Sequence, residues 1–503
     1  MNIAELAVKN IEKFGEYESL IFNENTYTNV ELHNKTLSLA HGLVKLGVKH
    51  GDRVGMVMAN CPEVMHSFGA CFMTGAWAMP VVFVLTAEQM IYIFKDSEAE
   101  VVVTHAIFLD KMLEVQKQVP TLKHIILADE NPPENYLSIK KIIAENPPEF
   151  EMVDCDPEDV ALLMYTSGTT GRPKGVMLSH NNLYSNALQT IKRDTIQPME
   201  MGLGVLPLNH SYGVITSLAG NISGSRGVML PWFAAEEVLK LIEKHKVVNI
   251  AMVPTMYIQI LNLPNHKDYD TGSMNRWICS ASPLPLEMRK RFEETFNCTI
   301  IEGYGLTEAS PAVALYPIGE PYRPGSVGLP LPDLEVSIQD EDGKNLPQGE
   351  VGEICVRGPN VMKGYYKMSE ETAEMLRGGW LHTGDAGYLD EDGYLYITER
   401  IKDLIIRGGV NIFPKDIEET LIRHPKIAEV AVVAKKDPVY GEEVLAVVVP
   451  NPGDELTEQE VLEYGEEHLP KFQKPKTAVV ADSLPKNPLG KVLKRKLREM
   501  YGQ

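Results

Sequence analysis

The sequence contains no run of about 18 consecutive apolar residues, so it predicts no membrane-spanning helix. Its opening stretch, MNIAELAVKNIEKFGEYESL, lacks the cationic segment followed by an apolar one that marks a secretory signal. A basic surplus is also missing, since 48 Lys and Arg stand against 69 Asp and Glu, a formal net charge of −21. This balance argues against nucleic acid as the main partner, although it leaves room for a local cationic pocket that binds a phosphorylated ligand.

Cysteine is scarce, and its 6 residues have no paired spacing. This pattern predicts neither a zinc site nor a disulfide framework, and it fits a reducing compartment, so we expect a cytoplasmic protein. The sequence has no internal repeats and no low-complexity segment. It leaves open the oligomeric state and a peripheral contact with a membrane.

At 503 residues the chain is longer than one hydrophobic core usually serves, so we expect at least two domains. Helical patterns such as residues 29–47 alternate with strand-length apolar runs such as 99–105 and 247–254. This alternation predicts an α/β fold whose large N-terminal domain is built of βαβ subdomains with largely parallel sheets.

After about residue 320 short strands and tight turns replace the alternation. Asp-Gly pairs at 342–343 and 392–393, flanked by alternating residues, predict two hairpins in a small β-barrel-like part. A small α+β unit follows. We therefore predict a large domain over 1–401 and a small, mobile C-terminal domain over 402–503.

The stretch YTSGTTGRPKG, residues 165–175, combines glycine, hydroxyl groups and cations directly after an apolar run. Glycines let backbone amides turn toward an anion, and hydroxyls and cations bind phosphate oxygens, so this segment predicts a loop that holds a polyphosphate. A Walker A loop is excluded because the spacing of Gly168, Gly171 and Lys174 does not match GxxxxGK[ST]. A flexible loop without a ligand is the alternative. The groups that would contact phosphate are Thr166, Ser167, Gly168, Thr169, Thr170, Gly171, Arg172 and Lys174.

The order of these residues resembles the signature loop of the adenylate-forming superfamily, in its acyl-CoA synthetase branch. A second stretch, IEGYGLTEAS at 301–310, resembles another core motif of that superfamily. A tyrosine ring can stack on a purine, a threonine hydroxyl can bond a phosphate, and a glutamate can bind Mg²⁺. The resemblance assigns these roles to Tyr304, Thr307 and Glu308. Taken alone, the stretch is also compatible with a turn that packs its tyrosine and exposes its glutamate.

Further matches follow the superfamily's order along nearly the whole chain. CSASPLP at 279–285 resembles the segment that lines the adenine site, although Ser280 and Ser282 depart from the usual glycine-alanine-alanine-proline wording. Asp385 matches an aspartate that binds the ribose hydroxyls, and Arg400 matches the arginine that assists it. The nucleotide-binding set that the resemblance implies also includes Ala281, Ser282, Pro283, Gly303, Gly305, Ile397 and Lys491.

The resemblance also assigns roles in the C-terminal part. Lys402 matches the hinge between the domains, and Gly408 and Gly409 match a loop that meets the thiol arm of coenzyme A. Lys491 matches a catalytic lysine, which Thr166, Thr307 and Glu308 would assist. We interpret the cations that follow it as a solvated helix face: Lys494, Arg495, Lys496 and Arg498.

The segment GVLPLNHSYGVITSL at 204–218 matches the border of the acid pocket. We expect His210, Tyr212 and Gly213 to contact the acid, together with Tyr257 and Gly303. Asn209 stands where many relatives have a bulky aromatic residue. Further candidates for the pocket wall are Val253, Met256 and Ile260. This apolar lining predicts an apolar acid, although such residues are also typical of an ordinary core.

The resemblance implies an ATP-dependent acid–CoA ligase that uses Mg²⁺ and coenzyme A. The acid would be converted to an acyl adenylate with release of pyrophosphate, and a thiol would then displace AMP. A fatty acid of medium or long chain is our first expectation, and an aromatic or alicyclic acid is the alternative. Loading of a carrier-protein thiol, or an inactive nucleotide-sensing scaffold, are the other interpretations.

We predict that Lys491→Ala slows adenylation by at least about a hundredfold, because a fixed cation stabilises the charge that develops on the phosphoryl oxygens. Thioester formation from supplied acyl-AMP should change much less. Pyrophosphate release and single-turnover thioester formation measure the two half-reactions separately. Equal loss of both would contradict a role that is confined to the first.

Overall fold

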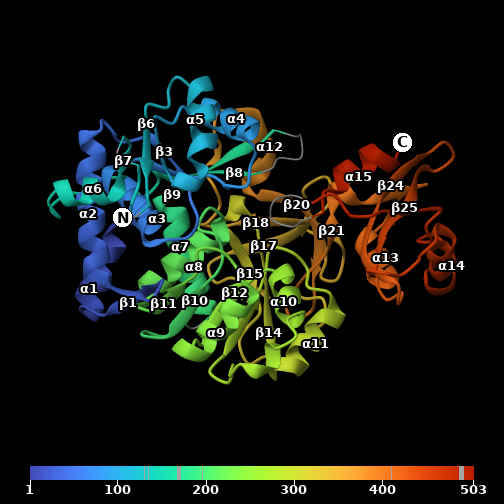
Figure 1. Ribbon diagram of the computed structural model, residues 1–503. Helices are drawn as coiled ribbons and strands as arrows, with labels where there is room; N and C mark the ends of the chain where they lie inside the picture. The colour runs from blue at the N-terminus through green and yellow to red at the C-terminus, as the bar shows by residue number, and fades with distance from the viewer. Residues whose placement is uncertain (130, 134, 167–171, 195, 409, 487–491) are drawn as a thin grey trace. The chain divides into compact units, whose positions relative to one another are not determined.

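The computed structural model describes residues 1–503 except 130, 134, 167–171, 195, 409 and 487–491. Within the described residues the chain divides into two compact units (Figure 1). Unit 1 comprises Met1–Val336 and Val356–Leu381, and unit 2 comprises Ser337–Cys355 and His382–Gln503. The fold class predicted from the sequence, α/β with a large N-terminal and a small C-terminal part, is confirmed. The predicted domain boundary at 401/402 lies inside unit 2 and stays a prediction.

A sheet of nine described strands forms the part of unit 1 that matters most for function, in the order β16-β15-β14-β13-β12-β10-β11-β1-β2. Its strands are β1 (Glu18–Phe22), β2 (Asn25–Thr28), β10 (Met201–Gly204), β11 (Arg226–Met229), β12 (Asn249–Met252), β13 (Arg276–Cys279), β14 (Ile300–Gly305), β15 (Ala312–Leu315) and β16 (Leu329–Pro330). The strands from β1 through β11, β10, β12 and β13 to β14 pair in parallel, so their carboxyl ends share one edge.

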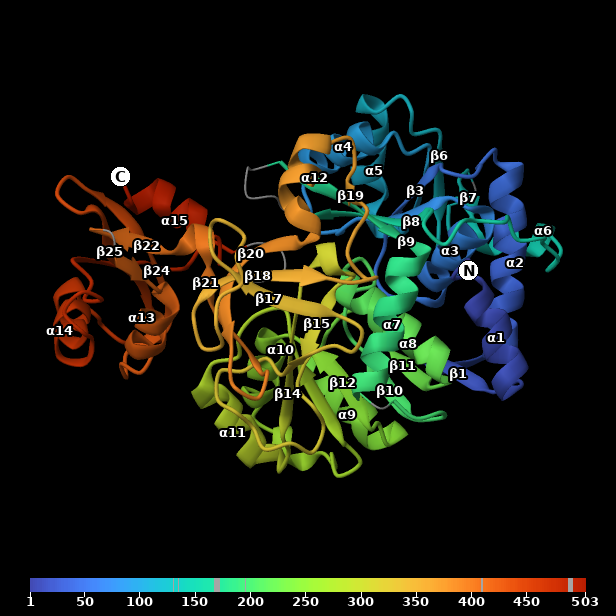
Figure 2. The same ribbon diagram turned by 180° about the vertical axis from the view of Figure 1, so that it is seen from behind.

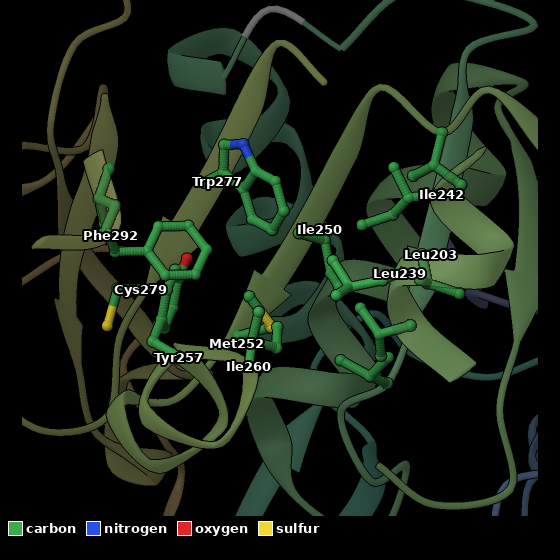
Figure 3. Close-up of a cluster of buried hydrophobic side chains, with 14 of the residues drawn as sticks. Leu203, Leu239, Ile242, Ile250, Met252, Tyr257, Ile260, Trp277, Cys279 and Phe292 are labelled. Carbon is green, nitrogen blue, oxygen red and sulfur yellow. The ribbon is translucent and has the colours of Figure 1, made fainter. Parts of the chain in front are cut away.

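Helices cover both faces of this sheet. They are α1 (Glu5–Phe14), α7 (His180–Asp194), α8 (Ser211–Ser223), α9 (Ala235–His245), α10 (Pro254–Leu261) and α11 (Leu286–Phe296). One face packs on α9, α10 and α11 through a buried cluster in which Leu203, Ile250 and Trp277 meet Leu239 and Phe292 (Figure 3). α8 packs instead against α1 and α7 (Figure 2). The strand that the sequence predicts at 247–254 is confirmed.

The second sheet of unit 1 has eight described strands in the order β19-β9-β8-β4-β3-β5-β6-β7. They are β3 (Arg53–Val57), β4 (Trp77–Pro80), β5 (Val101–Thr104), β6 (His124–Leu127), β7 (Leu137–Ser138), β8 (Val160–Thr166), β9 (Lys174–Ser179) and β19 (Gly364–Tyr365). Its helices are α2 (Asn29–Lys45), α3 (Pro62–Thr74), α4 (Ala87–Ser97), α5 (Leu109–Gln118), α6 (Ile139–Glu145) and α12 (Ser369–Met375). α2 begins where the Thr28 side chain accepts the Glu31 N–H, and α4 begins with a capping box of Thr86 and Gln89.

Unit 2 contains most of a sheet of four described strands, β17 (Glu335–Gln339), β18 (Gly352–Arg357), β20 (Leu381–Leu389) and β21 (Leu395–Arg400). The predicted hairpin at Asp392-Gly393 is confirmed, because β20 and β21 pair antiparallel across it. The hairpin predicted at Asp342-Gly343 is wrong in its second half. Its turn forms, but after it only an isolated bridge joins Gln339 to Asn345, and β17 lies beside β18 instead.

The rest of unit 2 is the α+β part that the sequence predicts. Its sheet of five described strands contains β22 (Ile405–Arg407), β23 (Val410–Ile412), β24 (Ile427–Asp437), β25 (Gly441–Pro450) and β26 (Thr477–Val480). Its helices are α13 (Pro414–Leu421), α14 (Glu458–His468) and α15 (Lys494–Tyr501). Across the part of the chain described in both units, no helix is long and apolar enough to cross a bilayer.

Two histidines are buried in unit 1 as neutral rings. His66 on α3 is 2% exposed with Nδ1 3.1 Å from the Thr36 hydroxyl, and His180 is 1% exposed with Nδ1 accepting the Ile3 N–H. Burial lowers the pKa of His66 to about 3 and that of His180 to about 4. Because an unfolded histidine keeps a pKa of about 6.5, the unfolded state binds more protons than the native state between these values.

We therefore expect the free energy of unfolding of unit 1 to be highest above about pH 6.5 and to fall as the pH is lowered below that value. Each histidine contributes a loss of about 1.4 kcal/mol per pH unit until its folded pKa is reached. Urea unfolding, followed by the fluorescence of Trp277 and the other tryptophans of unit 1, measures this slope. His66→Leu should reduce it, and the exposed-site control His468→Gln should not. An unchanged slope in His66→Leu would contradict the assignment.

Candidate active site

Two of the predicted site segments, 279–285 and 301–310, meet where β13 and β14 end. The Ser280 hydroxyl, just after β13, donates to the Gly303 carbonyl of β14 at 2.7 Å. Ala281 follows with a φ of 74°, a left-handed conformation that costs a non-glycine residue about 1–2 kcal/mol. A strained residue beside two strand ends is typical of a functional site.

The chain leaves β14 through a close backbone contact. A Cβ on Gly305 would lie 2.1 Å from the Pro311 carbonyl oxygen, so only glycine fits. The 3-10 turn η3 (Thr307–Ala309) follows and presents Thr307 and Glu308, while Tyr304 is 9% exposed. The Thr307 hydroxyl lies 3.3 Å from that of Ser211, the first residue of α8. The three residues that the second motif singles out are therefore grouped at one sheet edge.

Tyr365 links this turn to the phosphate-loop strands, although no sequence motif points to this residue. Its hydroxyl donates to Glu308 Oε1 at 2.9 Å, and Lys174 Nζ lies 4.8 Å from its ring centroid. Burial raises the pKa of Tyr365 and the Glu308 carboxylate adds to the rise, so the hydroxyl keeps its proton and donates it. Tyr365 stands in KGYYK, where neither composition nor spacing separates it from Tyr366.

The glycine-rich segment connects the antiparallel strands β8 and β9, and Thr166 pairs with Lys174 across them. Arg172 is exposed. The remaining predicted phosphate ligands lie outside the described residues: Ser167, Gly168, Thr169, Thr170 and Gly171.

A cavity of about 470 Å³ opens beside the ends of β13 and β14 and is bordered by α8. Of the predicted site residues, it is lined by His210, Tyr212, Gly213, Ala281, Gly303, Tyr304, Gly305 and Thr307. Burial lowers the pKa of His210, and its Nδ1 accepts the Tyr212 N–H at 3.2 Å, so the neutral ring carries its proton on Nε2. Gly213 is required where α8 begins, because a Cβ there would lie 2.3 Å from the Pro207 carbonyl oxygen.

The helix α10, which the sequence predicts as a wall of the acid pocket, does not line this cavity. Tyr257 is fully buried, packs edge-on against Phe292 with ring centroids 4.8 Å apart, and is not among the residues that line the cavity. Ile260 and Met256 pack in the same core cluster. Apolar residues recur with the same helical period whether a helix faces a core or a pocket, and on α10 they face the core.

In unit 2, Asp385 of β20 and Arg400 of β21 are cross-strand partners, and Arg400 Nε lies 2.7 Å from Asp385 Oδ1. Asp385 is 3% exposed. The turn before it is held by Glu353, whose carboxylate accepts the Gly384 N–H at 3.0 Å and lies 2.8 Å from His382 Nδ1. Ile397 pairs with Gly387 on the same two strands. Asp385 and Arg400 are thus paired, while their role in binding ribose stays a prediction, and Glu353 is a supporting residue that the sequence analysis missed.

The other predicted residues of unit 2 follow Arg400 in the chain. Lys402 is exposed in the 3-10 turn η5 (Ile401–Asp403), and its carbonyl accepts from Arg498 Nη1 at 2.9 Å. Gly408 has a φ of 58° in the turn between β22 and β23. Gly409 and Lys491 lie outside the described residues.

The predicted solvated face of α15 needs a correction. Arg495 and Lys496 are exposed as expected, but Lys494 is 16% exposed and pairs with Glu418 at 2.9 Å. Arg498 Nη2 lies 2.7 Å from Asp403 Oδ1. These two cations join α15 to other parts of unit 2 and do not form a free basic surface.

The donor set at η3 fits a magnesium ion. Mg²⁺ takes one or two carboxylates together with substrate phosphates and water. Glu308 supplies a carboxylate whose Oε1 is oriented by Tyr365, and the Thr307 hydroxyl stands beside it in the chain.

Comparison with known families agrees with this geometry. Residues 8–366 match the model of the AMP-binding enzyme family, and residues 416–491 match that of the AMP-binding enzyme C-terminal domain. The chain belongs to the AMP-binding enzyme family. Within the adenylate-forming superfamily it falls in the acyl-CoA synthetase branch, and this enzyme is an AMP-forming acid–CoA ligase that uses ATP and coenzyme A.

Its relatives act on different acids. The enzyme is 34% identical to a long-chain-fatty-acid–CoA ligase of Bacillus subtilis (strain 168), over 97% of this chain and 92% of that one. It is also 34% identical to a feruloyl-CoA synthase of Amycolatopsis sp, over 94% of each. Among solved structures, ATP-bound MatB from Rhodopseudomonas palustris superimposes with a TM-score of 0.91 at 32% identity, covering 100% of this chain and 99% of that one.

We predict that Tyr365→Phe raises the Mg²⁺ concentration needed for half-maximal adenylation by about tenfold, because a hydrogen bond to a charged group contributes about 1.5–3 kcal/mol. The phenylalanine ring keeps the contact with Lys174, so the change isolates the hydroxyl. Pyrophosphate release across a Mg²⁺ titration and calorimetry of Mg²⁺-dependent ATP binding measure the effect. The matched control is Tyr366→Phe, whose ring packs on Trp77. Identical Mg²⁺ dependence in both variants would contradict the role of Tyr365.

Proposed function

We propose that the enzyme activates an apolar monocarboxylic acid, a medium- or long-chain fatty acid, and transfers the acyl group to coenzyme A. The observation that carries this proposal is the extent of the cavity. Its lining runs from Tyr304 and Thr307 along α8 to apolar residues of α1 and α3 such as Leu6 and Phe72. Aliphatic and aromatic side chains dominate the lining, which favours an apolar tail.

The charged groups of the lining favour an acid with a single carboxylate. Among the described residues that line the cavity, Arg226 is the one lysine or arginine. Its Nη2 lies 2.8 Å from Glu18 Oε2, so it is already paired. A second carboxylate on the substrate would be buried without a free cationic partner, which is costly.

In the proposed first step a carboxylate oxygen of the acid attacks the α-phosphorus of ATP, and pyrophosphate leaves. His210 Nε2–H orients the acid at the cavity mouth, Tyr304 stacks on the adenine, and the Thr307 hydroxyl bonds a phosphate oxygen. Thr166, Lys174 and the intervening loop hold the β- and γ-phosphates. Mg²⁺ bound to Glu308 would supply positive charge beside the phosphates.

We further propose that Asp385 accepts the ribose hydroxyls and that Arg400 fixes its carboxylate, as their short ion pair supports. In the second step a thiolate of coenzyme A attacks the acyl carbon and AMP leaves. Lys402 would serve as the hinge of a C-terminal domain over 402–503, Lys491 would act in the first step, and Gly408 and Gly409 would meet the thiol arm in the second. We propose a cytoplasmic location for this reaction.

An aromatic acid is the second candidate, because the relative that is a feruloyl-CoA synthase is as similar to this enzyme as the fatty-acid ligase is. The two candidates differ in the length and flexibility of the tail that the cavity must accept.

A panel of acids followed by pyrophosphate release decides between them. We expect kcat/KM for a medium- or long-chain saturated acid to exceed that for ferulate or 4-coumarate by at least about tenfold. A preference of that size for the aromatic acids would overturn the proposal. Product analysis with free coenzyme A tests the acceptor in the same assay.

A further inference from the structure

Three glycines lie on neighbouring strands in the middle of the nine-stranded sheet. Gly202 and Gly204 belong to β10 and Gly227 belongs to β11, and Gly202 is the direct partner of Gly227 in the parallel register. Side chains alternate along a strand, and Leu203 points into the core shared with α9 and α11 (Figure 3), a core to which Val228 also belongs. The glycines therefore belong to the opposite face of the sheet.

That face borders the cavity, and all three glycines line it. Gly204 is exposed although its strand has a neighbour on each side and a packed core behind it. Its free surface is therefore surface of the cavity. In the adjoining strands the same face presents Leu20, Ala251 and Ile278, which also line the cavity.

The backbone does not require glycine at two of these positions. None of the three has a positive φ. A Cβ on Gly204 would meet only the Val228 carbonyl oxygen at 3.6 Å, and one on Gly227 only the Ser19 carbonyl oxygen at 4.0 Å, which are ordinary contacts. Glycine inside a strand costs about 0.5–1 kcal/mol relative to alanine and often marks close approach by a ligand. A larger side chain would fit the backbone at Gly204 and Gly227. These glycines therefore keep open the cavity space in front of them.

The position of this face sets a length. From Gly303 on β14, the strand order passes β13, β12 and β10 before it reaches Gly227 on β11. Four steps at a strand spacing of about 4.8 Å give roughly 19 Å. An extended chain advances about 3.5 Å per three bonds, so this distance corresponds to roughly sixteen bonds. A substrate that reaches the glycines therefore has a long, flexible tail, which a single aromatic ring with a short side chain does not provide.

Resting on the proposed function, we infer that the face formed by Gly202, Gly204 and Gly227 receives the distal part of an alkyl chain and sets the chain length that the enzyme accepts. The chemistry of the face agrees with this occupant. Glycine Cα atoms and the side chains of Leu20, Ala251 and Ile278 carry no charge and no hydrogen-bonding group, and Asn249, beside Gly202 on β12, adds an uncharged amide. Asp194, which also lines the cavity, has its Oδ1 3.6 Å from Arg276 Nε.

The test compares Gly204→Val and Gly227→Val with the wild-type enzyme on saturated acids of increasing length. A β-branched residue suits a strand, and its methyl groups would occupy the space now open. We expect kcat/KM for long-chain acids to fall by about a hundredfold while that for short acids stays within about twofold. Gly204→Ala should give a smaller shift in the same direction. Thr26→Val, on the exposed edge strand β2 of the same sheet, is the matched control and should leave the profile unchanged.

Each outcome has a defined meaning. A wild-type enzyme that prefers long chains, with the same length profile in both valine variants, overturns this inference and leaves the proposed function standing. A wild-type enzyme that rejects saturated acids overturns both. A uniform loss at every length also overturns the inference when thermal unfolding shows intact protein. If a valine variant fails to fold, Gly204→Ala decides by the presence or absence of a length-dependent shift.

Discussion

Side chains on a β-strand point alternately to the two faces of a sheet, and the central strands of the nine-stranded sheet use each face differently. Leu203, Ile250 and Trp277 fill the face toward α9 and α11, where they form a dry core. The residues between them, such as Gly202, Ala251 and Ile278, form a wall of the cavity. A shift of one residue in register would exchange the two sets, so packing on one face fixes the shape of the cavity on the other.

The parallel direction of these strands decides where the proposed site lies. The carboxyl ends of β12, β13 and β14 meet at one edge, and the cavity opens there beside Ala281 and Tyr304. The glycines at this edge serve a different purpose from those on β10 and β11. Gly305 and Gly213 allow backbone segments to pass closer than any Cβ permits, and so they place Thr307 and the start of α8 together. Polar contacts then orient what the backbone has placed, as the Tyr365 hydroxyl does for Glu308.

Local signals in the sequence identified much of this arrangement. The hairpin at Asp392-Gly393 and the helix over 29–47 follow from turn chemistry and periodicity, and both form as expected. The hairpin at Asp342-Gly343 carries the same turn signal, but only an isolated bridge follows its turn, and β17 pairs with β18 from further along the chain. Turn chemistry fixes a local bend, whereas strand pairing is decided by competition between segments far apart in the sequence. For the same reason Tyr365 was missed: its partner Glu308 lies far away in the chain, and no spacing rule connects them.

The pocket wall predicted on α10 was misplaced for a simple physical reason. An apolar helix face has the same spacing whether it faces a core or a cavity, so Tyr257 and Ile260 could not be assigned to a wall from periodicity. Glycines in strands are more informative. Replacing a glycine with a larger residue adds side-chain packing and lowers the conformational entropy that the backbone loses on folding, so a strand is normally more stable without glycine. Where a glycine stays although a Cβ would fit, as at Gly204, the fold gives up stability that the core on the opposite face must offset. The buried rings of Trp277 and Phe292, whose centroids lie 5.0 Å apart, provide such packing in that core. Stability and the open cavity are thus separated across the thickness of a single sheet.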